Sequence, residues 1–246
     1  MNKFTSIAVI ILAAGRGTRM YSTLPKVLFT INKKPILAIS LEKLDKLRLG
    51  QNLIVVGYRK ELVQRKIRIK TGKRYQYIDQ KELLGTGHAV LQALPHLSPQ
   101  IQTVMVINGD DSAFYKTKTL KDIINQHINS KAKMTIVTAN LKRADVYGRV
   151  VRDDTGRITN IKPDRDGSEI VCGLYLFDRL WLEEYLPKLE KSDSGEYLLP
   201  RLIFTALENG ALNSVKLADP KEWRSIDTPK ELIDARKLWG DLYGPI

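Results

Sequence analysis

Short apolar runs alternate with stretches in which apolar residues recur at helical spacing, and this alternation dominates the first half of the chain. Continuous apolar runs rich in Val and Ile are typical of strands buried on both faces of a parallel sheet. The pattern predicts strands at 7–12, 53–57, 75–78 and 103–107, with helices between them at 35–47, 59–70 and 86–94. Alternating strands and helices form right-handed βαβ units, so we expect an α/β fold with a mostly parallel sheet.

The second half carries similar signals in a less regular order. They predict strands at 133–140, 170–177 and 212–217, a hairpin of 147–151 and 156–161, and helices at 178–189, 197–208 and from 228. Thr228-Pro229 favours a helix start, because Pro is well tolerated in a first helical turn. Since no Pro- or Ser-rich linker interrupts the sequence, we expect a single domain over 1–246, divided into halves at about residue 130.

The composition is that of an ordinary globular protein, with 43% apolar residues. Cys172 is the single cysteine, which excludes an internal disulfide and fits a reducing compartment. The N-terminal apolar run is too short to cross a bilayer and is not followed by a cleavage site of small residues. We therefore expect a cytoplasmic protein without a membrane span.

The net charge is high, +13, from 40 basic and 27 acidic residues. A basic surface attracts polyanions, so part of this charge fits a phosphate-rich substrate; a basic surface without a specific role is the alternative. The six Lys and Arg residues within 65–74 are interpreted as a solvated helix face, with a partner-binding patch as the minority interpretation. Nucleic-acid binding is not favoured, because basic and aromatic residues do not interleave.

The first apolar run ends abruptly in a small, Gly-rich segment, Ala13-Ala14-Gly15-Arg16-Gly17. Backbone N–H groups in such a segment can approach an anion closely. Arg19 and Lys26 follow within reach, and the whole set suits a triphosphate. A plain Gly-x-Gly turn is the alternative, since the third Gly of the dinucleotide fingerprint and the Gly-Lys-Ser/Thr of the P-loop are both missing.

A second polar group follows the strand predicted at 103–107, in Asn108-Gly109-Asp110-Asp111. Ligands of open α/β sheets lie beyond the carboxyl ends of the strands, so we expect Asp110 on the same rim as the Gly-rich segment. A carboxylate at a strand end can be a structural turn residue, and for a lone Gly-Asp that is the usual case.

The string LAAGRGTRM, followed by LPKVL, resembles the signature of the sugar-phosphate nucleotidyltransferases (nucleoside-diphosphate-sugar pyrophosphorylases). It is most similar to the uridylyltransferase domain of the bacterial bifunctional N-acetylglucosamine-1-phosphate enzyme. The resemblance implies a Rossmann-like three-layer domain with a small C-terminal substrate-binding lobe, in which about 1–130 form a nucleotide-binding half and 131–246 a sugar- or acceptor-binding half. The activity it implies is the joining of UTP to a sugar 1-phosphate, such as N-acetylglucosamine 1-phosphate, with release of pyrophosphate. It implies catalytic roles for Arg19 and Lys26, and nucleotide binding by Leu12, Ala13, Ala14, Gly15, Gly17 and Arg19.

The resemblance also implies a Mg²⁺ site formed by Asp110 and Asp227. Mg²⁺ needs only one or two carboxylates when phosphates and water complete its ligands. Asp111 could substitute for Asp110 and ranks below it. Asp227 precedes a predicted helix, so a plain N-cap remains its rival explanation.

In the relatives, the segment matching Gln80 and Gly85-Thr86-Gly87 reads a pyrimidine base. A Gln side chain offers both a donor and an acceptor to a base edge, and glycines let the base lie against the backbone. A loop leading into a helix is the alternative. Gln80, Gly85 and Thr86 thus favour UTP and leave dTTP and CTP open.

Sugar binding is implied for Asn108, Gly148, Glu169 and Gly173, the second of these within Tyr147-Gly148-Arg149. The chain departs from the family here: Val171, Pro163 and Arg201 replace polar or acidic residues of the relative, and Asn108 replaces a Tyr. Such losses leave open another phosphorylated acceptor, or a regulator that binds nucleotide sugars without catalysis.

No hexapeptide repeats follow, so we expect no acetyltransferase β-helix domain, and a homo-oligomer remains open.

Overall fold

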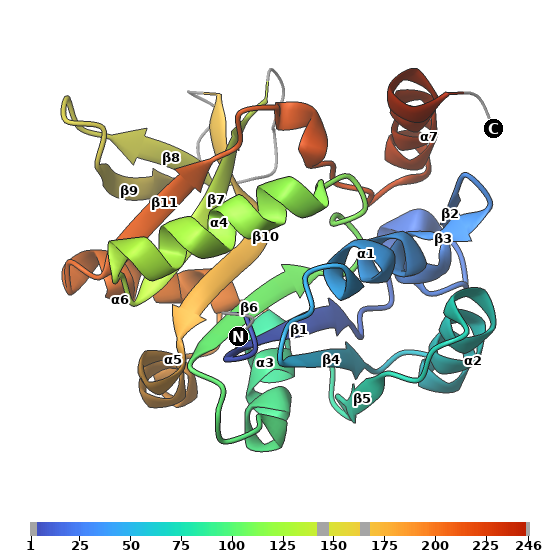
Figure 1. Ribbon diagram of the computed structural model, residues 1–246, viewed down its shortest axis with the longest axis horizontal. Coiled ribbons are helices and arrows are strands. Elements are labelled where there is room, and N and C mark those ends of the chain that lie inside the picture. Colours follow the sequence, from blue (N-terminus) through green and yellow to red (C-terminus); the bar gives the residue numbers. More distant parts are fainter. Residues whose placement is uncertain (1–3, 142–147, 163–167, 245–246) are drawn as a thin grey trace.

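The computed structural model describes residues 4–141, 148–162 and 168–244. Within this part of the chain a nine-stranded sheet forms the centre, and seven strands follow one path in the order β11-β7-β10-β6-β1-β4-β5 (Figure 1). The strands are β1 (Ile7–Ala13), β4 (Gln51–Val56), β5 (Gln76–Asp79), β6 (Thr103–Asn108), β7 (Met134–Asn140), β8 (Arg149–Arg152), β9 (Ile158–Lys162), β10 (Glu169–Asp178) and β11 (Leu212–Lys216). A separate small ribbon pairs β2 (Thr30–Ile31) with β3 (Lys34–Pro35).

Strand directions along this path are mostly parallel, as the sequence predicts. β6, β1, β4 and β5 run parallel to one another, and β11 runs parallel to β7. β10 is inserted antiparallel between β6 and β7, and it also pairs with β8 of the β8–β9 hairpin. The strands of the second half of the chain therefore extend the sheet that the first half begins.

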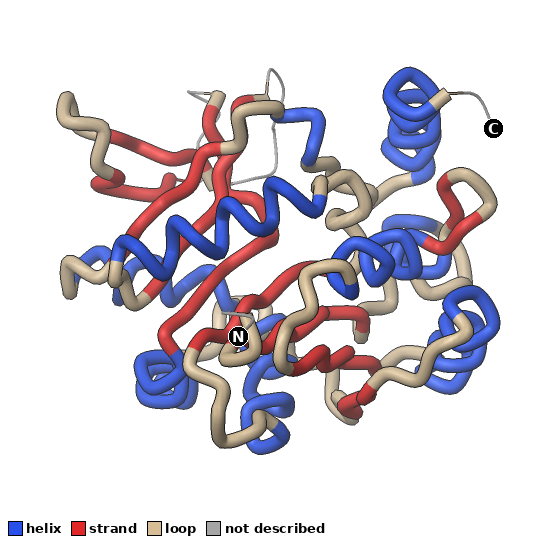
Figure 2. Tube along the Cα trace, viewed as in Figure 1, coloured by secondary structure: helices blue, strands red, loops and turns tan. Residues whose placement is uncertain are grey.

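Helices cover both faces of the sheet, which confirms the three-layer α/β class (Figure 2). Ile7, Val9 and Ile11 of β1 face one core with α1, α2 and α4, while Ala8 and Ile10 face a second core with α3, α5 and α6. This alternation follows from the two-residue period of a strand, and because both faces are covered, every position must be apolar. The helices are α1 (Ile36–Asp45), α2 (Lys60–Thr71), α3 (Thr86–Ala93), α4 (Thr117–Ser130), α5 (Arg179–Tyr185), α6 (Leu202–Glu208) and α7 (Pro229–Tyr243).

One helix was absent from the sequence prediction. α4 carries Leu120, Ile123, Ile124 and His127 at helical spacing, and all four side chains are buried. Polar residues separate these four positions and the mean hydropathy of the stretch is low, so it contains no continuous apolar run that would predict the helix.

Two predicted helices in the second half are shorter than expected. The helix expected at 178–189 ends at Tyr185 and continues as a 3-10 turn at Leu186–Lys188, which contains a Pro. The helix expected at 197–208 begins only at Leu202, because the backbone of Tyr197 is hydrogen bonded to the segment that precedes α3. The hairpin prediction is confirmed for its described residues, and its first residue, Tyr147, lies outside them.

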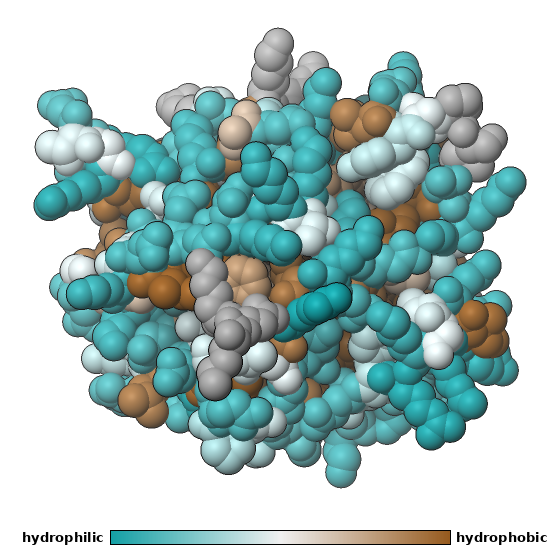
Figure 3. All heavy atoms as spheres, viewed as in Figure 1, coloured by the Kyte–Doolittle hydropathy of each residue, from teal (hydrophilic) through white to brown (hydrophobic). Residues whose placement is uncertain are grey.

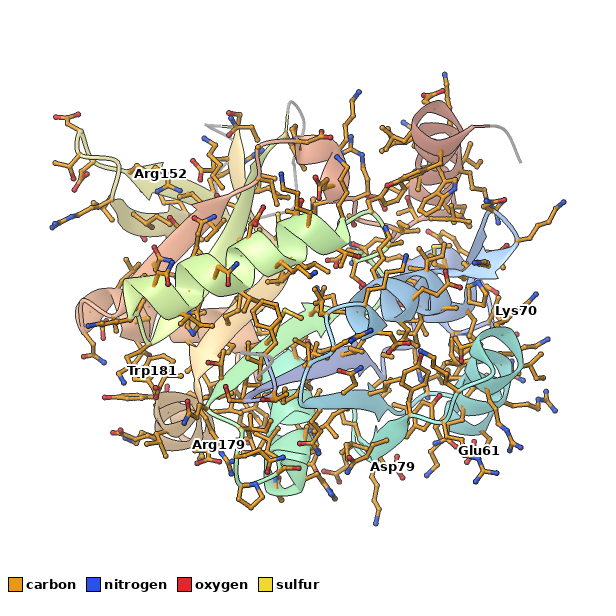
Figure 4. All side chains as sticks on the ribbon, in the orientation of Figure 1. Glu61, Lys70, Asp79, Arg152, Arg179 and Trp181 are labelled. Carbon is orange, nitrogen blue, oxygen red and sulfur yellow. The ribbon has the colours of Figure 1, made fainter. Side chains whose placement is uncertain are left out.

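The surface is largely hydrophilic on the face in Figure 3. On α2, Val63 and Ile67 are buried while the basic residues of 65–70 are exposed, as a solvated helix face requires. Glu61 and Lys70, labelled in Figure 4, extend from this helix away from the sheet. Among the described residues, no helix combines the length and the apolar character that crossing a membrane requires.

Candidate active site

The carboxyl ends of β1, β4, β5 and β6 meet at one edge of the sheet, and the segments that follow them line a cavity of about 1160 Å³. Residues singled out in the sequence gather in its wall: Leu12, Ala14, Gly15, Gly17, Arg19, Lys26, Gln80, Gly85, Thr86, Asn108, Asp110 and Asp227. A second, smaller cavity of about 240 Å³ is lined by Ala13 and several of the same residues. The Gly-rich segment and Asp110 therefore share one rim, as expected.

Gly17 allows the loop after β1 to lie directly against Lys26. Its φ is +65°, in the left-handed region that glycine tolerates best. A Cβ added to Gly17 would lie 2.7 Å from the Cβ of Lys26, closer than real Cβ atoms approach a neighbour. Glycine is thus required here both by the backbone conformation and by the space.

Lys26 begins a short 3-10 turn at Lys26–Leu28, in which Val27 and Leu28 are buried and anchor the main chain. Its Nζ contacts both Oδ2 of Asp110 and Oδ1 of Asp227, and none of the three side chains is more than 20% exposed. Burial by itself lowers the pKa of Lys26, but the two carboxylates outweigh burial, so the pKa is raised. Lys26 is therefore a permanent cation in the wall of the cavity.

Asp227 stands just before α7 but does not cap it. Thr228 is the N-cap: its side chain accepts a hydrogen bond from the backbone N–H of Glu231, and the Glu231 carboxylate accepts one from that of Thr228. The rival explanation of Asp227 as an N-cap is therefore wrong, and its carboxylate is directed to other partners.

Those partners are cations and a hydroxyl. Besides Lys26, Asp227 pairs with Arg19 at 3.1 Å through Oδ2, which also accepts a hydrogen bond from Ser225 Oγ at 2.9 Å. Burial tends to raise the pKa of Asp227, but Lys26, Ser225 and Arg19 lower it below its usual value. Asp227 is thus held as a carboxylate.

Asp110 and the adjacent Asp111 lie in different environments. Asp110 contacts Lys26, whereas Asp111 is buried and accepts a hydrogen bond from Asn108 Nδ2 at 3.1 Å. Burial first, and then the charge of Asp110, raises the pKa of Asp111 well above its usual value. A Cβ added to Gly173 of β10 would lie 2.0 Å from Asn108 Nδ2, so Gly173 makes room for this pair. Of the two carboxyls, Asp110 is the one directed at the cationic cluster.

Gln80 and the segment before α3 form another part of the cavity wall. The buried Gln80 side chain donates through Nε2 to the carbonyl oxygen of Gly85 at 3.0 Å, and the same nitrogen lies 3.1 Å from His88 Nδ1. Tyr197 holds the segment from the other side: its N–H donates to the Leu84 carbonyl at 2.8 Å, and its carbonyl accepts from the Gly87 N–H at 2.7 Å. This part of the wall is therefore fixed by both side chain and main chain.

The residues predicted to bind a sugar are not gathered in the same way. Asn108 lines the cavity, while the described residues Gly148, Glu169 and Gly173 do not. Their sugar-binding role stays a prediction. Pro163, aligned with a polar residue of the relative, lies outside the described residues.

The Glu169 carboxylate is instead bound by side chains from three neighbouring strands. This carboxylate accepts hydrogen bonds from Thr138 Oγ1 at 2.6 Å and Lys216 Nζ at 3.2 Å, and it pairs with Arg152 at 2.5 Å. Arg152, labelled in Figure 4, belongs to the β8–β9 hairpin. Burial tends to raise the pKa of Glu169, but these partners lower it to about 2. The hairpin is thus tied to the sheet by the ion pair between Arg152 and the buried carboxylate of Glu169.

The donor set at the rim fits Mg²⁺. In the described part of the chain no group of three or more His, Cys, Asp or Glu side chains is arranged to hold a metal. Two hard carboxylate ligands, Asp110 and Asp227, nevertheless converge on one cation, the Lys26 ammonium. Mg²⁺ is held by such a pair when phosphate oxygens and water supply its other ligands.

Sequence reasoning missed several residues of the cavity wall. Lys60 and Asp79 form an ion pair there, and the Arg16 guanidinium lies over the Tyr58 ring at 5.4 Å from its centroid. Asp79 ends β5, and Tyr58 and Lys60 closely follow β4, so their place at the carboxyl ends of parallel strands was the available signal.

Comparison with known proteins finds relatives that align with most of the chain. The chain is 35% identical over 240 residues to the bifunctional protein GlmU of Synechococcus elongatus, an alignment covering 94% of the chain and 52% of the relative. GlmU of Alcanivorax borkumensis is 35% identical over 241 residues, covering 95% of the chain and 51% of the relative. The chain thus spans about half the length of the curated relatives it matches.

A solved structure from Bacillus anthracis, described as a glucose-1-phosphate thymidylyltransferase in complex with sucrose, superposes with a TM-score of 0.80. It covers 98% of the chain and 96% of its own length at 20% identity, which establishes the shared fold. The family model for nucleotidyl transferases matches residues 8–240. The chain therefore belongs to the nucleotidyl transferase family.

Proposed function

We propose that this protein transfers a uridylyl group from UTP to the phosphate of a sugar 1-phosphate, such as N-acetylglucosamine 1-phosphate, with release of pyrophosphate. The observation that carries the proposal is the convergence of Arg19, Lys26, Asp110 and Asp227 on one end of a cavity of about 1160 Å³. Gln80 and Gly85 line another part of the same cavity, so phosphates and a base have separate candidate subsites.

Positioning and charge neutralisation supply the catalysis in this proposal, without a protein nucleophile. The acceptor phosphate attacks the α-phosphorus in line, and pyrophosphate leaves. The loop at Gly15–Gly17 offers backbone N–H groups to the leaving pyrophosphate, and Arg19 adds a positive charge to it. Lys26 binds the α-phosphate or the acceptor phosphate. These two negatively charged groups must approach each other for the reaction, and the positive charge of Lys26 reduces their repulsion.

Asp110 and Asp227 are the residues that would hold Mg²⁺, which when bound would screen charge between the two phosphates. Their support is the convergence of both carboxylates on one cation. The low pKa of Asp227 keeps its carboxylate ionised at neutral pH, as metal ligation requires.

The orientation of the Gln80 side-chain amide favours uracil over cytosine as the base. Its Nε2 faces the Gly85 carbonyl and His88, while within the described residues its Oε1 has no hydrogen-bond partner. An oxygen acceptor at this position pairs with the N3–H of uracil or thymine, whereas the corresponding nitrogen of cytosine is itself an acceptor. The free Oε1 of Gln80 therefore favours UTP and dTTP over CTP, and the resemblance in sequence favours UTP.

The acceptor is the less constrained half of the proposal. Asn108, the cavity residue assigned to the sugar, is held by Asp111, and Val171 stands where the relative has an Asn. A different phosphorylated acceptor is therefore the second candidate. This candidate keeps the same residues around Lys26 and differs only in the group attached to the acceptor phosphate.

The test is Mg²⁺-dependent pyrophosphate release, measured for a matrix of nucleoside triphosphates and phosphorylated acceptors. We expect release with UTP and a sugar 1-phosphate, dependent on both. Release with another acceptor would identify the second candidate. Binding of a nucleotide sugar without any release across the matrix would replace the proposal by a regulatory role.

A further inference from the structure

We propose that Lys26 is an internal counter-ion that competes with the divalent metal for Asp110 and Asp227, so that the metal is loaded only as bound phosphates draw Lys26 away. This inference rests on the proposed function, because it takes Asp110 and Asp227 as the metal ligands. It adds an order to the loading of the site and a second role for Lys26.

The Lys26 ammonium contacts the same two carboxylates that a metal ion shared by Asp110 and Asp227 would need as ligands. Lys26 Nζ contacts Oδ2 of Asp110 and Oδ1 of Asp227, and those carboxylates come from the ends of β6 and of the segment before α7. A metal held by both residues must approach the same two carboxylates. With a positive ammonium between them, the approach of a dication is opposed by repulsion at close range.

The remaining carboxylate positions of Asp227 are also in use. Its Oδ2 pairs with Arg19 at 3.1 Å and accepts from Ser225 at 2.9 Å. Lys26 and Arg19 together balance the charges of Asp110 and Asp227, so the cluster has no excess negative charge to attract a free dication. A triphosphate changes this balance, since its oxygens offer Lys26 and Arg19 new partners.

Rotation of the Lys26 side chain is sufficient for the exchange. Its main chain is fixed by the 3-10 turn, and its Cβ, Cγ and Cδ lie beside Gly17. The exchange therefore needs only the outer part of the side chain to turn, so that Nζ moves from the carboxylates to a phosphate without backbone movement. Nucleotide and metal binding are then coupled, because each favours the state in which Lys26 has left the carboxylates.

The experiment measures Mn²⁺ binding to the nucleotide-free protein by the loss of the free-ion signal in electron paramagnetic resonance. Mn²⁺ prefers oxygen ligands as Mg²⁺ does. We expect Lys26→Gln to bind Mn²⁺ about tenfold or more tightly than the wild type, because one repelling charge is removed. Lys60→Gln is the matched control: it removes the same charge from the same cavity, beside Asp79, and its Mn²⁺ affinity should equal that of the wild type.

Equal Mn²⁺ affinity of Lys26→Gln and the wild type would overturn the inference, as would an equal gain in Lys26→Gln and Lys60→Gln. Thermal melting checks that the variants fold, and Lys26→Met replaces Lys26→Gln if the latter does not. Adding Asp110→Asn to Lys26→Gln should abolish the gain. If instead Mn²⁺ binds no variant, with or without UTP, the metal assignment within the proposed function fails as well, which is a distinct outcome.

Discussion

The guanidinium of Arg19 lies 3.1 Å from the carboxylate of Asp227, so the loop after the first strand is tied to the segment before the last helix. Lys26 holds the other oxygen of the same carboxylate. The candidate site therefore combines residues from early and late parts of the described chain, and Asp227 supplies it with a charge that the first half of the sequence does not contain.

Asp227→Asn should lower turnover by about 10²- to 10³-fold, because the side chain keeps its shape but loses the charge that faces Lys26 and Arg19. Thr228→Ala is the neighbouring control. It removes the N-cap of α7 and should lower the free energy of unfolding by about 1 kcal/mol with turnover nearly unchanged. Steady-state rates and chemical denaturation measure the two effects. Similar losses of turnover in both variants would show that Asp227 acts through helix stability.

Lys26→Ala should lower turnover by orders of magnitude, on the order of 10³-fold, and leave the fold intact. The reason is that Lys26 is the cation proposed to bind the α-phosphate or the acceptor phosphate, and among the described residues no other cation lies between Asp110 and Asp227. Circular dichroism and thermal melting check the fold, and pyrophosphate release gives the rate. A variant with a nearly normal rate would contradict the catalytic role of Lys26.

Gly17→Ala should both destabilise the protein by about 1–3 kcal/mol and reduce turnover, since its Cβ would strain the left-handed backbone and collide with Lys26. Gly72→Ala is matched to it: Gly72 also has a positive φ, +67°, but nothing lies within 4 Å of an added Cβ. We expect Gly72→Ala to cost about 1 kcal/mol and to retain its turnover. Equal losses of turnover in the two variants would show that the contact of Gly17 with Lys26 has no particular effect on the reaction.

The Glu169 cluster predicts a pH dependence of stability. The pKa of Glu169 is lowered from 4.5 to about 2, so its contribution is full above pH 4.5 and is lost as the pH falls toward 2. Glu169→Gln should therefore lower the free energy of unfolding on the order of 2 kcal/mol at pH 7, and the difference from the wild type should shrink across that window.

Denaturant unfolding between pH 7 and pH 2 measures this difference. Glu42→Gln is its control, because Glu42 pairs with Lys34 on the surface and should change stability by less than about 0.5 kcal/mol. A Glu169→Gln difference that stays constant with pH would show that the buried charge is not what stabilises the hairpin.

Much of the first half of the chain could be predicted, because its signals are contiguous in the sequence. The run Ile7–Ala13 and the glycines after it specify a buried strand and its loop within one short string. Asp110 follows the end of β6, and the rule for carboxyl ends of parallel strands places it on the same rim. At these positions the local sequence pattern and the topology of a parallel sheet indicate the same structure, so it can be predicted without knowing any contact between distant residues.

The partners of each charge could not be predicted in the same way. Thr138, Arg152 and Lys216 lie on three strands, and only the antiparallel insertion of β10 brings them to Glu169. Tyr197 shortens a predicted helix because its backbone joins Leu84 and Gly87, a contact between segments far apart in the sequence. Tertiary hydrogen bonds here override the local helical signal.

The most direct test of the central claim follows the phosphorus atoms of UTP during reaction with a sugar 1-phosphate and Mg²⁺. With UTP labelled separately at the α- and γ-phosphates, we expect the α-label to enter the nucleotide sugar while the γ-label leaves as pyrophosphate, and we expect Lys26→Ala to suppress both. Release of the γ-label as inorganic phosphate, or transfer that persists at the wild-type rate in Lys26→Ala, would contradict this claim.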